Sequence, residues 1–195
     1  TLLTLQDDEG FFPAWLHPET LEPSDVLRQT PETSMSVTFL LKLAALTDDP
    51  RYRDAALRAM DAVLAEIVPH GRWEDFETYW SCCGFGKEEF YGRRIPRNGL
   101  YKQCNFSMFW TAEALLACYR VTGDERYLRW GRRTLDELAM TQQSWQPPYI
   151  YIPALGGFGV MNFDGEWNDS RQCLFAELFM DYYRETGEPA LFERG

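Results

Sequence analysis

The sequence contains very little histidine, with only His17 and His70 among its 195 residues. Catalysis by a pair of histidines, one as acid and one as base, is therefore not favoured. Basic residues are also outnumbered, because 19 lysines and arginines stand against 30 acids and the formal net charge is −11. Such a chain has no basic surface with which to neutralise phosphates, so neither nucleic acid nor an anionic membrane is expected as a partner.

Long hydrophobic runs are missing as well. No stretch of about 18 apolar residues occurs, so no membrane span is expected. The five cysteines are odd in number, include the adjacent pair Cys82 and Cys83, and lack the Cys-x-x-Cys spacing of a zinc ribbon or redox site. Free, mostly buried thiols are therefore expected, which together with the lack of a visible signal peptide weakly favours the cytoplasm.

Aromatic residues, by contrast, make up 15% of the chain, with 7 Trp, 10 Tyr and 13 Phe. Rings at this frequency either fill a bulky core or line a binding site. The length is sufficient for one domain of ordinary size with a substantial core.

Three segments repeat one pattern of a helix, a short polar turn and a second helix. Apolar residues recur every three or four positions within them, which predicts amphipathic helices. A unit that recurs in this way indicates a repeat architecture. The sequence therefore predicts an all-α fold of helical hairpins, with room for short β segments in the long loops. The three turns are Thr47-Asp48-Asp49, Thr122-Gly123-Asp124 and Thr186-Gly187-Glu188.

The connections between these elements are of two kinds. Gly123 and Gly187 fit the left-handed position that closes a helix, and Pro50 and Pro189 fit the first turn of the helix that follows. The links between hairpins are much longer, over about 69–102 and 141–168, and long ordered links are uncommon unless they are functional. Short turns should lie at one end of the fold and long links at the other. The helices that begin near Glu32, Asn105 and Asp169 should then point their N-termini at the same end.

The repeated hairpin and its Thr-Gly-Asp-x-Arg-Tyr turn, at Thr122–Tyr127, resemble the six-hairpin glycosidase superfamily, whose members fold as an (α/α) toroid. The resemblance covers the chain from about Glu32 to Gly195 and identifies no member family. It implies an irregular arm over residues 1–30 and a partial toroid over 31–195, with about two and a half hairpins and a truncated C-terminal end. An incomplete ring exposes apolar surface on its inner helices, so self-association, or further C-terminal hairpins that complete the toroid, is expected.

The loop GGFGVMNFDGEWNDSRQ, residues 156–172, combines glycine, acid and indole in front of a helix. Glycosidases need two carboxyl groups around the scissile bond, about 5 Å apart for retention and roughly 6.5–9.5 Å apart for inversion. Asp164 and Glu166 are the predicted acid/base catalysts, with Asp75 or Glu77 as a partner across the cleft.

Rings and polar side chains in both long links suit a saccharide groove, because rings stack on the apolar faces of sugars and carboxylates accept hydrogen bonds from hydroxyls. Core packing at the mouth of the barrel is the alternative for the rings, and a helix N-cap is the alternative for Asp169. The predicted substrate-binding residues are Trp73, Tyr79, Trp80, Tyr149, Tyr151, Trp167, Asn105, Asp169 and Arg171.

A zinc site is a weaker alternative. Some toroidal β-L-arabinofuranosidases hold zinc with a glutamate and several cysteines, and Glu32 with Cys82 and Cys83 is faintly similar to that set. The similarity fails at Ser34, where that family has a cysteine ligand, so a four-ligand site is not assembled. No metal and no cofactor is expected.

The carboxylates and the resemblance together favour a glycoside hydrolase-like enzyme that acts on an oligosaccharide or polysaccharide. A non-catalytic carbohydrate-binding or scaffold toroid is one alternative. A polysaccharide lyase is another, in which Arg93, Arg94, Arg97 or Arg171, with Asn105, neutralises a uronate carboxylate. Toroidal sugar epimerases resemble this fold but use a pair of histidines, so the scarcity of histidine counts against that activity.

Overall fold

The computed structural model describes residues 2–79, 91–161 and 167–195. These ranges contain α-helices joined by turns and loops. Their β structure is limited to two isolated bridges. The prediction of an all-α fold of helical hairpins is confirmed. Five residues singled out from the sequence lie outside the described ranges: Trp80, Cys82, Cys83, Asp164 and Glu166.

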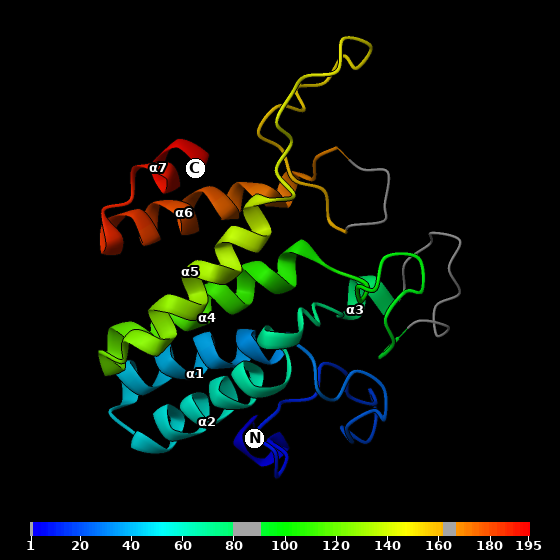
Figure 1. Cartoon of the computed structure of the whole chain (residues 1–195). Helices are drawn as coiled ribbons and strands as arrows, with labels where there is room; N and C mark the ends of the chain where they lie inside the picture. Colours follow the sequence, from blue (N-terminus) through cyan, green and yellow to red (C-terminus); the bar gives the residue numbers. More distant parts are fainter. Residues whose placement is uncertain (1, 80–90, 162–166) are drawn as a thin grey trace.

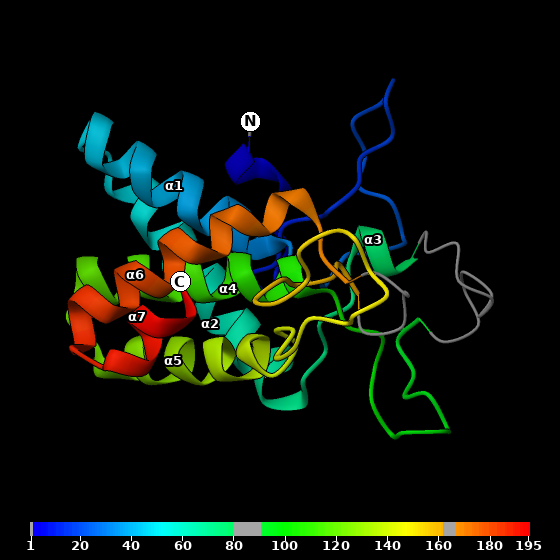
Figure 2. The same cartoon turned by 90° about the horizontal axis from the view of Figure 1, so that it is seen from above.

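The helices follow one another as hairpins. In the first, α1 (Thr33–Thr47) packs on α2 (Pro50–Glu66), and in the second, α4 (Asn105–Thr122) packs on α5 (Glu125–Ala139). The third consists of α6 (Cys173–Thr186) and the short α7 (Pro189–Arg194). Because α4 contacts both α1 and α6, these three first helices lie side by side (Figures 1 and 2). Shorter elements are the 3-10 helices η1 (Leu2–Leu5), η2 (Val68–His70) and η3 (Ser170–Gln172) and the one-turn helix α3 (Phe76–Tyr79).

The same type of hydrogen bond occurs at each of the three short turns. In each, the threonine that ends the first helix donates its Oγ1 hydrogen to the carbonyl four residues earlier. The donor–acceptor distance is 2.8 Å for Thr47, 2.7 Å for Thr122 and 2.8 Å for Thr186. The threonine that recurs in the sequence therefore forms the same hydrogen bond at the C-terminal end of each first helix.

The backbone after each threonine also repeats. Gly123 and Gly187 have φ of 71° and 72°, which confirms their predicted left-handed role, and Asp48 takes the same conformation in the first turn with φ of 54°. Pro50 and Pro189 begin α2 and α7 as predicted. The turns thus follow from local backbone chemistry, in which a left-handed residue ends one helix and a proline fits the first turn of the next.

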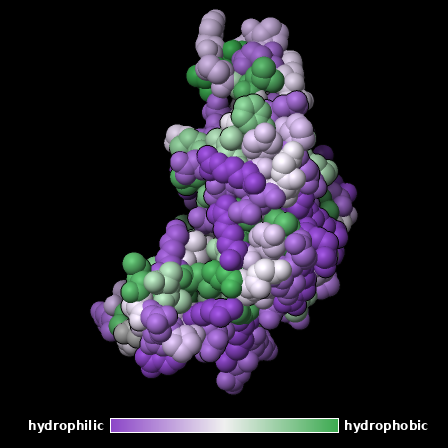
Figure 3. All heavy atoms as spheres, turned by 90° about the vertical axis from the view of Figure 1, so that its left-hand side faces the viewer, coloured by the Kyte–Doolittle hydropathy of each residue, from purple (hydrophilic) through white to green (hydrophobic). Residues whose placement is uncertain are grey.

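The short turns and the long links lie at opposite ends of the helices (Figure 1). The N-termini of α1, α4 and α6 share the end that carries α3 and the long links, as the sequence predicts. Figure 3 looks onto the other end, where hydrophilic surface dominates and is interrupted by hydrophobic patches.

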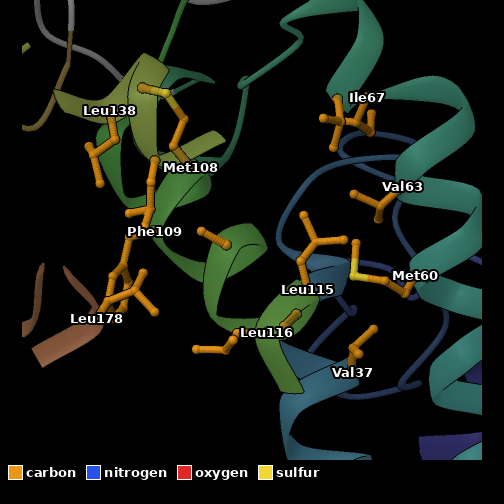
Figure 4. Packing of buried hydrophobic residues seen from close by; sticks show 14 of the residues in the cluster. Val37, Met60, Val63, Ile67, Met108, Phe109, Leu115, Leu116, Leu138 and Leu178 are labelled. Atoms are coloured by element: carbon orange, nitrogen blue, oxygen red, sulfur yellow. The ribbon is translucent and has the colours of Figure 1, made fainter. Parts of the chain in front are cut away.

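The core lies between the paired helices (Figure 4). Val37 of α1, Met60 and Val63 of α2, and Leu115 of α4 are each 0% exposed and pack together at the first hairpin. Burial of an aliphatic side chain contributes about 1.5–3 kcal/mol. This packing fixes the first hairpin against the second. A second group joins α4, α5 and α6 through Met108, Phe109, Leu138 and Leu178.

The arm before α1 is irregular after η1, and two of its rings enter the core. Phe11 and Phe12 are 1% and 2% exposed. The backbone of Phe12 exchanges two hydrogen bonds with the side chain of Thr33, since its N–H donates to Oγ1 at 3.1 Å and its carbonyl accepts from Oγ1 at 3.0 Å. The arm is thereby attached to the first residue of α1.

Apolar side chains on the first helices remain exposed. Met35 and Phe39 of α1 are 48% and 54% exposed, and Leu174 of α6 is 45% exposed. The expectation that a second copy, or further hairpins, covers such surface stays a prediction. None of the described helices is long and apolar enough to cross a lipid bilayer.

The contact between α5 and α6 generates a test of the fold. A Cβ atom on Gly131 would lie 1.8 Å from Oη and 2.9 Å from Cζ of Tyr182. The phenol is 0% exposed and donates to the carbonyl of Ala112 at 2.7 Å, so the ring has no room to retreat. We expect Gly131→Ala to lower the free energy of unfolding in urea by about 1–3 kcal/mol, in spite of alanine's higher helix propensity.

Tyr182→Phe in the Gly131→Ala background removes the clashing oxygen and should recover part of that loss. The Tyr182→Phe single variant is the control for the lost hydrogen bond. A Gly131→Ala protein as stable as wild type would show that α5 and α6 do not meet at this point.

Candidate functional site

Glu32 connects the start of α1 to α3. It lies immediately before Thr33, and its carboxylate accepts a hydrogen bond from Oγ1 of Thr30 at 3.3 Å. The backbone of Phe76, at the start of α3, favours its ionised form. Asp75 and Glu77, on either side of Phe76, lie close enough to repel its negative charge. Three carboxyl groups from two segments distant in the sequence are therefore brought to one end of the fold.

The environment of Glu32 raises the pKa of its carboxyl to about 7, from an ordinary value of 4.5. Removal from water is the largest cause and the negative charge of Asp75 the next, because both disfavour the ionised form. The side chain is only partly buried, so it can still reach solvent. Near neutral pH this group can both donate and accept a proton.

Asp75 was predicted as a catalytic carboxylate, and the structure corrects that role. The side chain is 0% exposed, and its two oxygens accept from Oγ of Ser107 at 2.6 Å and from the backbone N–H of Thr78 at 3.0 Å. Burial raises its pKa, and the hydrogen bonds from Cys104 and Ser107 oppose that rise. Asp75 thus holds α3 against the start of α4 and has no surface for a substrate.

Glu77 lies on the accessible side of α3. Its Oε1 accepts from Nη1 of Arg171 at 2.8 Å, a contact between residues 94 positions apart. Nε of Arg171 also bonds Oδ1 of Asp169 at 2.9 Å, and the guanidinium lies 4.6 Å from the ring centroid of Phe106. Glu77 is 32% exposed and Arg171 49% exposed, so both remain available to a ligand. Two long links therefore meet at this ion-pair network.

Asp169 has the structural role that the sequence left open. Its Oδ1 accepts from the backbone N–H of Arg171 at 2.8 Å and so caps η3. The hydrogen bond from the Arg171 side chain lowers the pKa of Asp169 and keeps the carboxylate ionised. It orients Arg171, and its predicted contact with substrate stays a prediction.

A second set of buried charges holds the segment after residue 90 to α3. Glu74 is 1% exposed, and both its oxygens accept from the backbone N–H of Gly92 at 3.1 Å. Burial raises the pKa of Glu74 to about 7, against the opposing effects of that hydrogen bond and of Arg72 and Lys102. Lys102, also 1% exposed, donates from Nζ to the carbonyl of Thr78 at 3.2 Å. These groups are enclosed and serve the loop structure.

Trp73 and Asn105 were predicted to bind substrate, and the structure corrects both. Trp73 is 0% exposed and its indole N–H donates to Oε2 of Glu137 at 2.9 Å, so the ring is core between the first and second hairpins. Asn105 is 2% exposed and donates from Nδ2 to the carbonyl of Gly159 at 2.7 Å. Its Oδ1 is buried without a hydrogen-bond partner among the described residues. Both side chains are buried in the structure, so neither is accessible to a sugar.

The other predicted rings divide into two groups. Tyr79 is 7% exposed at the end of α3, where its ring meets that of Tyr91 edge to face at 5.5 Å. Tyr149 and Tyr151 are 69% and 105% exposed on a loop that projects from the helices (Figure 1). Trp167 is partly buried and meets Trp145 edge to face at 6.5 Å. Tyr79 alone of these shares α3 with Glu77.

The sequence reasoning used Glu32 only as a member of the weaker zinc alternative. No local signal marks Glu32 for this role, because its raised pKa comes from burial and from the charges of Asp75 and Glu77, which are distant in the sequence. In the ranges that the structure covers, no group of three or more His, Cys, Asp or Glu side chains is arranged to hold a metal ion. Cys82 and Cys83 of the zinc alternative lie outside those ranges.

The raised pKa of Glu32 generates a test of stability against pH. The folded protein keeps this proton up to about pH 7, whereas the unfolded chain releases it near 4.5, so ionisation of Glu32 costs folding stability as the pH rises between these values. Glu32→Gln removes that cost. Relative to wild type, the variant should gain on the order of 1–3 kcal/mol between pH 5 and pH 8 in urea unfolding. Glu66→Gln, on the exposed end of α2, is the matched control and should keep the wild-type pH dependence.

No protein-family model and no curated protein matches the chain. Among solved structures, the fold is shared with the crystal structure of a sugar epimerase from a ruminal bacterium, with a TM-score of 0.59 and 16% sequence identity. The superposition covers 99% of this chain and 48% of the epimerase chain. The chain therefore spans about half the length of that protein, and at this identity the likeness shows the fold alone.

Proposed function

We propose that the protein is a carbohydrate-active enzyme in which Glu32 transfers a proton at the end of the fold where α1, α3 and α4 begin. The observation that carries this proposal is the pKa of Glu32, about 7, beside the accessible carboxylate of Glu77. General acid–base catalysis is most efficient when the pKa of the group lies near the working pH. A perturbed carboxyl next to a second carboxyl and a paired arginine is a candidate site for this reason.

Hydrolysis of a glycosidic bond is the reaction that this pair supports best. One carboxyl must be protonated to protonate the leaving group, and the other must be ionised to act as a nucleophile or to activate water. Glu32 fits the first role. Glu77, 2.8 Å from the guanidinium of Arg171, fits the second. Asp164 and Glu166, predicted for the same chemistry, remain candidates.

The carbohydrate class is supported by the surroundings. The rings of Tyr79 and Trp167 belong to the same two links as Glu77 and Arg171, and rings beside carboxylates suit a sugar. The shared fold with a sugar epimerase points to the same class.

Epimerisation of a sugar is the second candidate, and the fold shared with the epimerase favours it. In that reaction Glu32 would act first as a base and remove a proton from a carbon next to a carbonyl. A lyase is less favoured, because a uronate would have to compete with Glu77 and Asp169, which already pair with the guanidinium of Arg171.

Glu32→Gln should abolish the proton transfer while leaving binding intact. In a screen of oligosaccharides that counts new reducing ends, we expect kcat to fall about 10²- to 10⁴-fold, with binding by calorimetry unchanged. Wild-type kcat/KM should fall as the pH rises above about 7, because the general acid is then ionised. Asp164→Asn and Glu166→Gln, measured beside it, test whether those residues share the role.

The two candidate reactions differ in product and in pH dependence. Epimerisation creates no reducing ends, incorporates deuterium from D₂O at the epimerised carbon, and speeds up as Glu32 ionises towards pH 7. Glu66→Gln serves again as the control and should retain full activity. Wild-type turnover in the Glu32→Gln protein would overturn the assignment of Glu32, and saccharide binding without any product would indicate a binding protein.

A further inference from the structure

A groove lies between the N-terminal arm and α3. It encloses about 640 Å³ and is lined by residues of the arm between 15 and 26, together with Tyr79. The arm folds back there as a small hairpin, since the N–H of His17 donates to the carbonyl of Glu22 and the N–H of Ser24 to the carbonyl of Trp15, each at 2.9 Å. Figures 1 and 2 place this part of the arm beside α3.

Trp15 connects the groove to the proposed site. Its ring meets that of Phe76 edge to face at 5.8 Å, and it remains 37% exposed. Phe76 lies between Asp75 and Glu77, the two carboxylates whose charges act on Glu32. Tyr79, which lines the groove, lies two residues after Glu77 on α3, and the two side chains point to different sides of the helix. Trp15 and Tyr79 thus connect the groove to the short segment that carries Asp75 and Glu77.

The lining has the chemistry of a sugar subsite. Trp15, 37% exposed, offers ring surface, Tyr79 forms part of the wall, and the lining includes polar groups from His17, Glu22 and Thr20. Nδ1 of His17 accepts from two backbone N–H groups at 3.3 Å, which leaves Nε2 as the protonated nitrogen that can donate to a hydroxyl. Rings pack on the apolar faces of a sugar while donors and carboxylates bind its edges.

The charge of the groove selects among saccharides. Its acidic side chains are Glu22 and Asp25, and Asp25 pairs with Arg28 at 3.0 Å. The whole chain carries a net charge of −11. A polymer of uronates or sulfated sugars would be repelled, whereas a neutral saccharide would not.

The shape of the arm hairpin is maintained by tertiary contacts. Leu21 and Leu27 have φ of 59° and 60°, a left-handed conformation that leucine seldom adopts. Leu27 is 1% exposed and its carbonyl accepts from the N–H of Ala14 at 3.3 Å, so packing holds the base of the hairpin in place. Because this hairpin is already fixed by packing, little conformational entropy should be lost when a ligand binds in the groove.

We propose that this groove binds a sugar unit next to the one on which Glu32 acts, so that the substrate is a neutral oligosaccharide or polysaccharide. This inference rests on the proposed function, since it extends the same site. It assigns Trp15 to the recognition of chain length and gives it no part in proton transfer.

The test compares Trp15→Ala with wild type on neutral glucose oligomers of increasing length, in α-1,4 and β-1,4 linkage. Binding is measured by calorimetry and turnover by new reducing ends. We expect Trp15→Ala to weaken binding of the longer oligomers about tenfold or more and to raise their KM, with little change for the shortest oligomer that is bound. Trp15→Phe keeps a ring and should recover part of the loss, which separates recognition from misfolding.

Phe192→Ala removes an exposed ring from α7, far along the chain from the groove, and should behave as wild type. Equal effects of Trp15→Ala on short and long oligomers, unchanged binding of the long ones, or binding of uronate oligomers in preference to neutral ones would each overturn the groove assignment. Such results leave the loss of turnover in Glu32→Gln intact, so the two proposals fail separately.

Discussion

The packing of α1 against α4 determines where every candidate site residue lies. Val37 and Leu115 meet in the core with no exposed surface, and Oγ of Ser34 and Oγ1 of Thr111 share a buried hydrogen bond of 3.0 Å between the two helices. Because the helices run side by side and close with short turns at one end, their N-termini must gather at the other. The contact between Glu77 and Arg171 is a consequence, since it joins two links that only this alignment brings together.

Glu32 and Glu74 illustrate how similar pKa values arise from different environments. Burial raises both to about 7. Glu74 is fully enclosed, with both oxygens bound to the N–H of Gly92 and with Arg72 3.6 Å away, so its proton has no route to a ligand. Glu32 is only partly buried, and its nearest charges are carboxylates. The raised pKa identifies both groups, and accessibility then selects Glu32 as the candidate for chemistry.

The helices and their turns could be predicted because their determinants are local. The period of apolar residues, the left-handed Gly123 and Gly187, and the prolines at the first turn act within a few residues of themselves. The position of the long links could be predicted as well. Because the short turns join the helices at one end, the long links must join them at the other.

The roles of individual site residues could not be predicted in the same way, because burial depends on tertiary contacts. Trp73 and Tyr79 lie six positions apart in one aromatic segment, yet the first is core and the second lines a groove. Asp75 and Glu77 are separated by one residue, and α3 turns one inward and the other towards Arg171. A stretch of mixed rings and acids indicates that a site is near, and only the path of the backbone decides which of them faces it.

The chemistry proposed for Glu32 therefore depends on α3, a helix of four residues that is too short to be stable alone. Its position comes from buried polar contacts: Asp75 bonds Ser107 of α4, and Lys102 bonds the carbonyl of Thr78. Trp15 of the arm packs on its outer side. Because Asp75 and Glu77, at the start of α3, carry the charges that repel ionised Glu32, and Tyr79 lines the groove, a shift of this one turn would alter the pKa of Glu32 and the shape of the groove together. The two proposals, proton transfer by Glu32 and recognition of a neighbouring sugar, therefore depend on the same short element.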